Sequence, residues 1–504
     1  MKKIITVGLI SILFGIVSTA TFAALILEEI ATLEEAASHG DKEALKILTK
    51  AANEDNIDAQ ISLGGLYYNG TGVAQNYSEA VNWTKKAADK GSSVAQTVLA
   101  SYYIKGEALP QDYKLALIWM KKAAEQGHPK AQFLLGNMYE FGYGNTKNVN
   151  EAIIWYRKAA ESGIPEAQSS LGTNYLFGKG VSLDYSQALS WLSKAAEQGD
   201  AQGQAGLGQI YSFGLGVQQS DTIAFNWFSK AAKQNHITAQ YRLGSYYEGG
   251  TGTSVDYAEA AKWYRKAAEE GHRDAQHRLG VLYDNGQGVT EDKQEAFSWY
   301  KAAADSGLAD AQFMVGYFYY AGAGKILEDQ VEAFNWFSKA AEQGHGYAQG
   351  TLGDVYSEGR GVTQDYTVAS EWYQKAGNQG IRSALNNLAS LYENGLGVPK
   401  DYKKAAALYT KAASQKEVNA LNNLGNLYEK GFGVPKLKVL AFALYSMSSE
   451  LNEGTNSAIS NRLTLEEKLK PKEIEAAKKL MGELNKPDNF TKALDAYLKI
   501  AKVK

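Results

Sequence analysis

The 504-residue chain repeats itself with a period of 36 residues, and this period constrains the fold more than any other feature. If the first alanine of each unit is position 0, Ala-Gln or a close variant opens eleven units between Ala59 and Asn456. One unit, which begins at Ala311, has 37 residues. Such a period predicts an array of stacked units, because one short unit cannot bury its apolar face alone.

Each unit carries the pattern of two helices joined by a glycine turn. Position +4 is Leu in ten units and Val315 in the other, and position +8 is Tyr in all eleven. Positions 0, +4 and +8 share one helical face, so they predict a buried stripe. Paired glycines such as Gly70 and Gly72 then predict the end of the first helix. A second helix holds an alanine and, three residues later, an anchor position that carries all nine tryptophans. We expect these tryptophans to be structural.

The consensus resembles a known repeat family. Ala-Gln-x2-Leu-Gly-x2-Tyr-x2-Gly-x-Gly-Val, followed by Asp-Tyr-x2-Ala-x2-Trp-x2-Lys-Ala-Ala, is similar to the Sel1-like repeats, which are relatives of tetratricopeptide repeats. The resemblance implies an all-α fold, a right-handed α/α superhelical solenoid, and a role as scaffold for protein complexes. Exported bacterial members are linked to envelope assembly, host-cell interaction and, in one case, binding of secretory immunoglobulin A. The plan of the present chain is similar to that of this last member.

The ends of the chain differ from the repeats. Residues 1–23 combine Lys2 and Lys3 with an apolar stretch of 14 residues, which is short for a membrane span, so they predict a signal peptide. We expect export to the periplasm or the medium, with no membrane insertion of the mature chain. Residues 24–58 contain a truncated unit and predict an N-terminal helical cap, residues 59–456 the eleven repeats, and residues 457–504 a C-terminal helical cap or tail.

Two features of the tail predict helix starts. Thr464 and Glu467 have the spacing of a capping box. Pro471 suits the first turn of a helix that continues to about Leu484. Charged end helices of this kind would cover the open ends of the stack.

Composition argues against several classes of site. Net charge is −3 and the basic residues are dispersed, so we expect no nucleic-acid ligand. With no cysteine, the chain has no disulfide and no thiolate metal site. Four histidines share one inter-repeat turn position, namely His128, His236, His272 and His345, which indicates a structural role. We expect no catalytic residue, cofactor or metal, and a monomer.

The exposed face of the first helices is the candidate binding surface. By analogy with related solenoids, first helices line the concave surface, and positions +2, +6 and +9 lie opposite the core. Most units carry small or polar residues there, such as Asn386, Ser390 and Glu393, whereas the unit at Ala311 has Phe313, Tyr317 and Tyr320. These three lie at about 200°, 240° and 180° from Ala311, so we expect one exposed aromatic face.

Further aromatic residues extend this set of candidates. Tyr241 occupies position +2 of the sixth repeat. A phenylalanine stripe at position +10 borders the core in three successive units, at Phe141, Phe177 and Phe213. For this stripe, simple packing is favoured over partner binding.

These features favour an exported adaptor that binds a bacterial envelope protein or a host protein on its concave surface. One alternative is an envelope scaffold for peptidoglycan or polysaccharide machinery. A second alternative is a hydrolase acting on cell-wall or β-lactam substrates, although no Gly-x-Ser-x-Gly or Ser-x-x-Lys nucleophile motif occurs.

Overall fold

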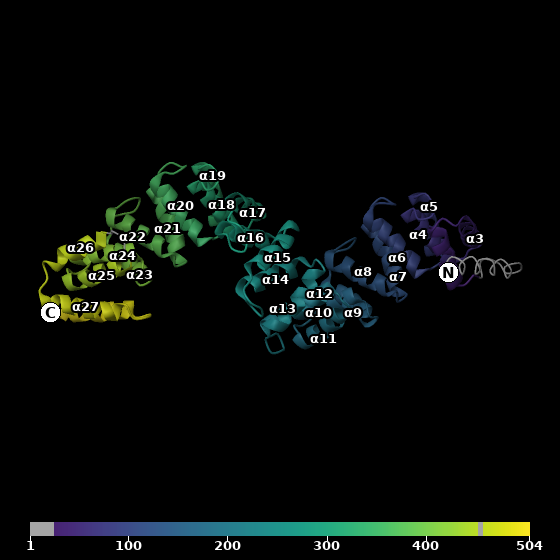
Figure 1. Ribbon diagram of the computed structural model, residues 1–504, viewed down its shortest axis with the longest axis horizontal. Helices are drawn as coiled ribbons and strands as arrows, with labels where there is room; N and C mark the ends of the chain where they lie inside the picture. The colour runs from purple at the N-terminus through teal and green to yellow at the C-terminus, as the bar shows by residue number, and fades with distance from the viewer. Residues whose placement is uncertain (1–24, 452–456, 504) are drawn as a thin grey trace. The chain divides into compact units, whose positions relative to one another are not determined.

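The computed structural model describes residues 25–451 and 457–503, and the predicted signal peptide lies outside these residues. In this part of the chain the regular elements are 27 α-helices and no strand, which confirms the all-α solenoid fold (Figure 1). None of these helices is both long and apolar enough to cross a membrane. Two compact units divide the chain, one ending at Val255 and the other beginning at Asp256.

Eleven helix pairs follow one another along the repeats, and within each of the two compact units every helix of the repeats packs on its neighbours in the sequence. The first helices are α4 (Ile57–Asn69), α6 (Ser93–Lys105), α8 (Pro129–Phe141), α10 (Pro165–Phe177), α12 (Ala201–Phe213), α14 (Ile237–Gly249), α16 (Arg273–Asn285), α18 (Ala309–Ala321), α20 (Gly346–Glu358), α22 (Arg382–Asn394) and α24 (Val418–Lys430). The second helices are α5 (Tyr77–Asp89), α7 (Tyr113–Glu125), α9 (Val149–Glu161), α11 (Tyr185–Glu197), α13 (Asp221–Lys233), α15 (Tyr257–Glu269), α17 (Lys293–Asp305), α19 (Gln330–Glu342), α21 (Tyr366–Asn378), α23 (Tyr402–Ala413) and α25 (Lys438–Leu451).

Helices at both ends extend the stack. The N-terminal pair is α2 (Leu27–Ser38) and α3 (Lys42–Asn53), which pack against each other and against α4. The C-terminal helices are α26 (Ser457–Glu466), α27 (Pro471–Leu484) and α28 (Phe490–Val503), and α25 contacts both α26 and α27. The expected helix from Pro471 is present. The expected capping box at Thr464 is wrong, because Thr464 already lies inside α26, and Glu473 instead accepts from the backbone N–H of Lys470 at 2.8 Å.

The core follows the predicted stripe. Alanines at position 0 and the residues at +4 are almost completely buried, whereas most tyrosines at +8 are half-buried. Glycine at +5 in nine units permits close packing, since a Cβ on Gly136 would lie 2.6 Å from the Tyr156 ring; Ala100 and Ala389 hold this position in the other two units. The backbone oxygen of the +8 tyrosine accepts a hydrogen bond from the residue that caps the second helix, as Tyr175 does from Asp184 at 3.1 Å.

The tryptophans are buried or half-buried, as expected of structural residues. In eight units a lysine three residues later places its Nζ over the indole ring, as Lys230 does over Trp227 at 4.0 Å. The aliphatic part of the lysine can thus cover the indole while the ammonium group stays in water.

Side chains cap both helices of most units. Asp184, Asp256 and Asp365 accept from backbone N–H groups at the start of second helices, as predicted. The four turn histidines do the same for first helices through Nδ1, for example His345 from Ala348 at 3.0 Å. The repeated turn position of these histidines therefore has a definite structural cause.

A buried glutamine at position +1 links neighbouring units. Gln312 donates from Nε2 to the Ala304 oxygen at 3.2 Å, and its Oε1 accepts from Gln343, the C-cap of α19, at 2.7 Å. Four other units have the same bond, namely Gln126–Gln96, Gln198–Gln168, Gln234–Gln204 and Gln379–Gln349.

Four buried glutamines lack this acceptor bond. Among the described residues, the Oε1 atoms of Gln60, Gln132, Gln240 and Gln276 have no hydrogen-bond partner. Thirty residues after each of them, the sequence has Lys90, Ser162, Glu270 or Ser306 in place of glutamine. These four bonds are therefore missing because the residue thirty positions after each buried glutamine is not itself a glutamine.

Candidate partner-binding surface

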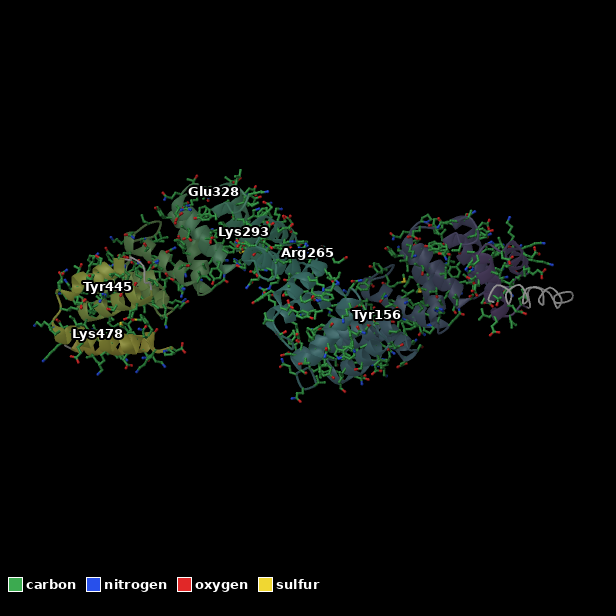
Figure 2. The ribbon with its side chains drawn as sticks, in the orientation of Figure 1. Tyr156, Arg265, Lys293, Glu328, Tyr445 and Lys478 are labelled. Atoms are coloured by element: carbon green, nitrogen blue, oxygen red, sulfur yellow. The ribbon has the colours of Figure 1, made fainter. Side chains whose placement is uncertain are left out.

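In many units the side chain at +9 of the first helix contacts the second helix of the same repeat, contrary to the expectation that it faces a partner. Glu393 accepts a hydrogen bond from the Tyr409 hydroxyl at 2.9 Å, and Asn386 at position +2 is buried. Figure 2 labels two tyrosines of this class within their helix pairs, Tyr156, which donates to Glu140, and Tyr445, which donates to Glu429. Burial raises the pKa of both hydroxyls well above its ordinary value.

The residues of this contact vary together along the chain. Units whose second helix has a tyrosine at the position of Tyr156 carry a carboxylate at +9 of the first helix. The exception has its carboxylate at +6, where Asp354 accepts from Tyr373 at 2.7 Å. Units in which that tyrosine is replaced carry Tyr68, Ile104, Leu176, Ser212 and Tyr320 at +9. In these five units the residue at +9 is not a carboxylate, and the second helix has no tyrosine at the position that would contact it.

The aromatic residues of α18 do not form one exposed face. Tyr317 is 51% exposed, but Phe313 and Tyr320 are half-buried. Their ring centroids lie 5.7 Å and 6.1 Å from that of Phe337 on α19, because α19 packs beside this part of α18. The Tyr320 hydroxyl also accepts a hydrogen bond from Arg360. The prediction of a shared exposed face is therefore wrong for Phe313 and Tyr320, and Tyr317 remains a candidate contact.

The phenylalanine stripe is exposed, which contradicts the favoured packing interpretation. Phe141, Phe177 and Phe213 are 59%, 49% and 56% exposed. Each is the last residue of its first helix, where the following glycine turns the chain away and leaves the ring uncovered. Tyr241, the remaining candidate, is half-buried on α14.

Two rings of the stripe stand at a groove across α10, α12 and α14. The groove has a volume of about 210 Å³, and Phe177, Phe213 and Ala205 are among its lining residues. Helix α12 is recessed because its glycines let it approach α11 and α13 closely. A Cβ on Gly206 would lie 2.8 Å from Leu192, and one on Gly208 would lie 2.6 Å from Phe228.

The groove has a cationic character. None of its fourteen lining residues is acidic, and Arg242 is exposed at its edge. The Arg242 guanidinium has no hydrogen bond or ion pair with any residue that the structure describes, although it lies 6.0 Å from the Tyr241 ring centroid. Thr173 Oγ1 is buried in the lining and has no hydrogen-bond partner within the described chain.

His236, also in the groove lining, is fully engaged in the fold. Its Nδ1 accepts from the Ala239 N–H at 3.2 Å, so the ring proton resides on Nε2, which donates to Gln202 Oε1 at 3.0 Å. Burial lowers the pKa of this imidazole. At neutral pH the positive charge of the groove therefore comes from Arg242.

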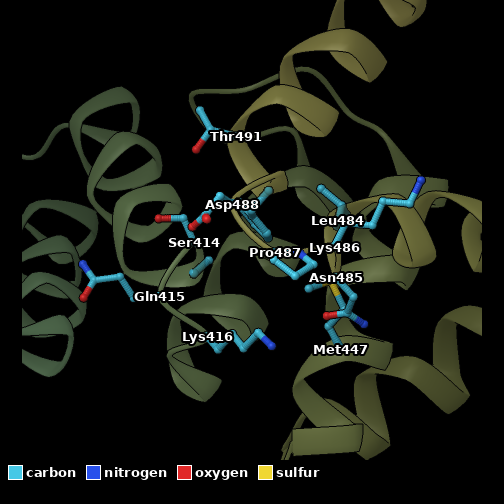
Figure 3. A pocket seen from close by; sticks show the side chains of 12 residues that line it. Ser414, Gln415, Lys416, Met447, Leu484, Asn485, Lys486, Pro487, Asp488 and Thr491 are labelled. Carbon is cyan, nitrogen blue, oxygen red and sulfur yellow. The ribbon is translucent and has the colours of Figure 1, made fainter.

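A second cavity, of about 470 Å³, lies near the C-terminal end. Figure 3 shows the loop of Pro487 and Asp488 opposite the turn that carries Ser414 and Lys416. Lys416 and Asp488 have φ values of 59° and 53°, in the left-handed region that glycine fills in most inter-repeat turns. This cavity is lined mainly by turn residues and does not include the exposed aromatic stripe.

Comparison with known proteins is consistent with this architecture. The family model for the Sel1 repeat matches eleven consecutive segments of the chain, which together span residues 57–453. A protective antigen of uropathogenic Escherichia coli strains, solved with an SLR fold, is 35% identical over 91% of this chain and 97% of its own, with a TM-score of 0.77. A Sel1 repeat protein of Oxalobacter formigenes is 32% identical over 62% of this chain and 89% of its own, with a TM-score of 0.45. Comparison with curated protein sequences found no match.

Proposed function

Because the chain belongs to the Sel1 repeat family, we propose that it is an exported, non-enzymatic adaptor that binds a protein partner on its first-helix surface. Solenoids of this type are in general scaffolds for protein–protein interaction, since stacked units present an extended surface. The observation that carries the proposal is the exposed stripe of Phe141, Phe177 and Phe213.

Exposed phenylalanine rings in three successive repeats are unfavourable in water and typical of an interaction site. Aromatic residues also contribute strongly to binding when a partner covers them. The stripe is contained in the first compact unit, at the ends of α8, α10 and α12. Tyr317 on α18 offers a separate exposed aromatic contact in the second unit.

The nature of the partner is supported by one relative. The related Escherichia coli protein is described as a protective antigen, which favours a surface-exposed or secreted adaptor that contacts a host protein. The alternative is an envelope scaffold that organises peptidoglycan or polysaccharide machinery. Both alternatives use the same surface, but they place the partner in different compartments.

The proposal is tested by photo-crosslinking with single cysteines. The chain has no cysteine, so each introduced thiol carries the crosslinker alone. We place cysteine at Gln209 on α12 and at Tyr317 on α18, with Ser186→Cys on the second helix α11 as the matched control. We expect crosslinked partner with at least one of the first-helix variants and none with the control.

The source of the partner separates the alternatives. Crosslinking in host fluid and in intact periplasm is compared, and the partner is identified by mass spectrometry. A partner captured equally from Ser186→Cys contradicts a first-helix binding surface. Turnover of a β-lactam or peptidoglycan substrate by the purified chain, with a chelator control, would instead favour a hydrolase.

A further inference from the structure

We propose that the groove of α10, α12 and α14 binds a short extended peptide segment that combines a large apolar side chain with an aspartate or glutamate. This inference rests on the proposed function, because it names the chemistry of the partner at one part of the first-helix surface. Three features of the groove point to this ligand: its size, its exposed rings and the guanidinium of Arg242, which has no ion pair among the residues that the structure describes.

The size of the groove favours a peptide segment. Its volume of about 210 Å³ is smaller than the ~300–1,000 Å³ of typical pockets for drug-sized ligands, so the groove itself takes about one large side chain of a segment whose backbone lies along the surface. Adjacent helices lie roughly 8–10 Å apart, so a path across three first helices measures about 16–20 Å. An extended chain of about five or six residues at ~3.3 Å per residue spans that length.

The lining divides into an apolar part and a polar part. Phe177 and Phe213 expose about half of their surface, and the small side chain of Ala205 on α12 lines the same groove. A large apolar side chain placed there covers both rings. This contact removes apolar surface from water on both partners, which is the main favourable contribution to such binding.

Arg242 supplies the charge complementarity. Its guanidinium is exposed, it is not paired with a carboxylate in the described part of the chain, and no acidic residue lines the groove. A guanidinium binds a planar carboxylate through two parallel hydrogen bonds. A phosphate would usually be held by a cluster of cations, and the groove offers one arginine. Of the two anionic groups that a peptide can carry, a carboxylate and a phosphate, the lining therefore favours the carboxylate.

The groove lining also contains a buried polar group without a hydrogen-bond partner among the described residues, the hydroxyl of Thr173. Buried hydroxyl groups are normally paired, because loss of hydration without a replacement bond is unfavourable.

The experiment is a selection with a random heptapeptide library displayed on phage. The purified chain is the bait, and Arg242→Gln and Ala205→Leu are parallel baits. Arg242→Gln removes the charge at an exposed position, and Ala205→Leu fills the groove. Arg278→Gln, which changes the arginine at the same repeat position of the next unit, is the matched control. Thermal melting of each variant confirms that it is folded.

We expect peptides with an acidic residue beside a large apolar residue to be enriched at least tenfold on the wild-type chain. Enrichment should fall at least tenfold on Arg242→Gln and Ala205→Leu and persist on Arg278→Gln. Absence of such peptides, or equal recovery on Arg242→Gln, overturns the inference. If Gln209→Cys or Tyr317→Cys still crosslinks a partner in that case, the adaptor function stands and only the peptide chemistry is wrong.

Discussion

Replacement of Ser306 by glutamine should stabilise the array, because it supplies the hydrogen bond that Gln276 lacks. Ser306 is the C-cap of α17, with φ and ψ of −78° and 4°. The glutamine cap of α19, Gln343, has −78° and 0°, and its amide reaches the equivalent buried oxygen at 2.7 Å. The backbone at residue 306 is thus already placed for a glutamine to make the same contact.

The expected magnitude follows from two opposing effects. A net intramolecular hydrogen bond is worth about 0.5–1.5 kcal/mol, and the unpaired buried oxygen of Gln276 suggests the upper part of this range. Ordering the longer glutamine side chain opposes this by up to about 1 kcal/mol, less than full burial requires, since the cap is at the surface. We therefore expect Ser306→Gln to raise stability by about 0.5–1 kcal/mol. The reverse change, Gln343→Ser, should lower it by about 1–2 kcal/mol.

The assay combines urea denaturation of the full chain with hydrogen exchange of peptides from α16 and α17. Exchange localises the effect, which matters because a long repeat array need not unfold in one step. Ser306→Glu is the control, since it has the same length but presents no amide donor to Gln276. If Ser306→Gln and Ser306→Glu are equally stable, the unpaired oxygen is not the cause and the reasoning is refuted.

Three further predictions concern pH, the tryptophans and α18. Burial lowers the pKa of three capping histidines, His128, His236 and His345, below the ordinary value of 6.5. The unfolded chain therefore binds more protons than the folded chain, so stability should fall as pH drops below about 6.5. Melting from pH 8 to 5 measures this fall. A flat profile over that range would exclude this linkage. Trp227→Ala should lower stability by about 3 kcal/mol in urea melts, because its half-buried ring packs against the core cluster that contains Leu207. A change under about 0.5 kcal/mol would show a surface residue. Phe313→Ser should melt at a lower temperature than the wild type, because the Phe313 ring packs on Phe337. Tyr317→Ser should melt like the wild type and weaken partner capture by about 2 kcal/mol. The opposite ranking of melting temperatures would reverse our assignment of the two side chains.

The repeat pattern predicts the fold because its fixed residues act through local rules. Position 0, +4 and the glycine turns determine helix faces and helix ends, and Asp184 at the start of a second helix is recognisable as a cap. These features require only the spacing of residues within one unit. The bounds of α27 from Pro471 follow from the same reasoning.

Exposure on the first-helix face depends on contacts that one helix cannot reveal. Helical angles place Phe313 opposite the core of α18, but α19 and α20 approach from that side and cover part of it. Phe141 lies next to the core in angle, yet it ends its helix and is left exposed. The pairing of tyrosine with the carboxylate at +9, as in Tyr409 and Glu393, was detectable in the sequence as joint variation between units.

That pairing affects how the array can change its length during evolution. Tyr409 and Glu393 are 16 residues apart within one helix pair, so loss or duplication of a complete 36-residue unit carries both partners together. Recombination between repeats in the gene can therefore alter the number of units without leaving a buried tyrosine hydroxyl without its carboxylate acceptor. The groove of α10, α12 and α14 takes its side chains from three successive repeats. Loss of the repeat that contains α12 would therefore remove the lining residues in the middle of the groove. Array length and ligand preference are thus subject to different genetic constraints in this chain.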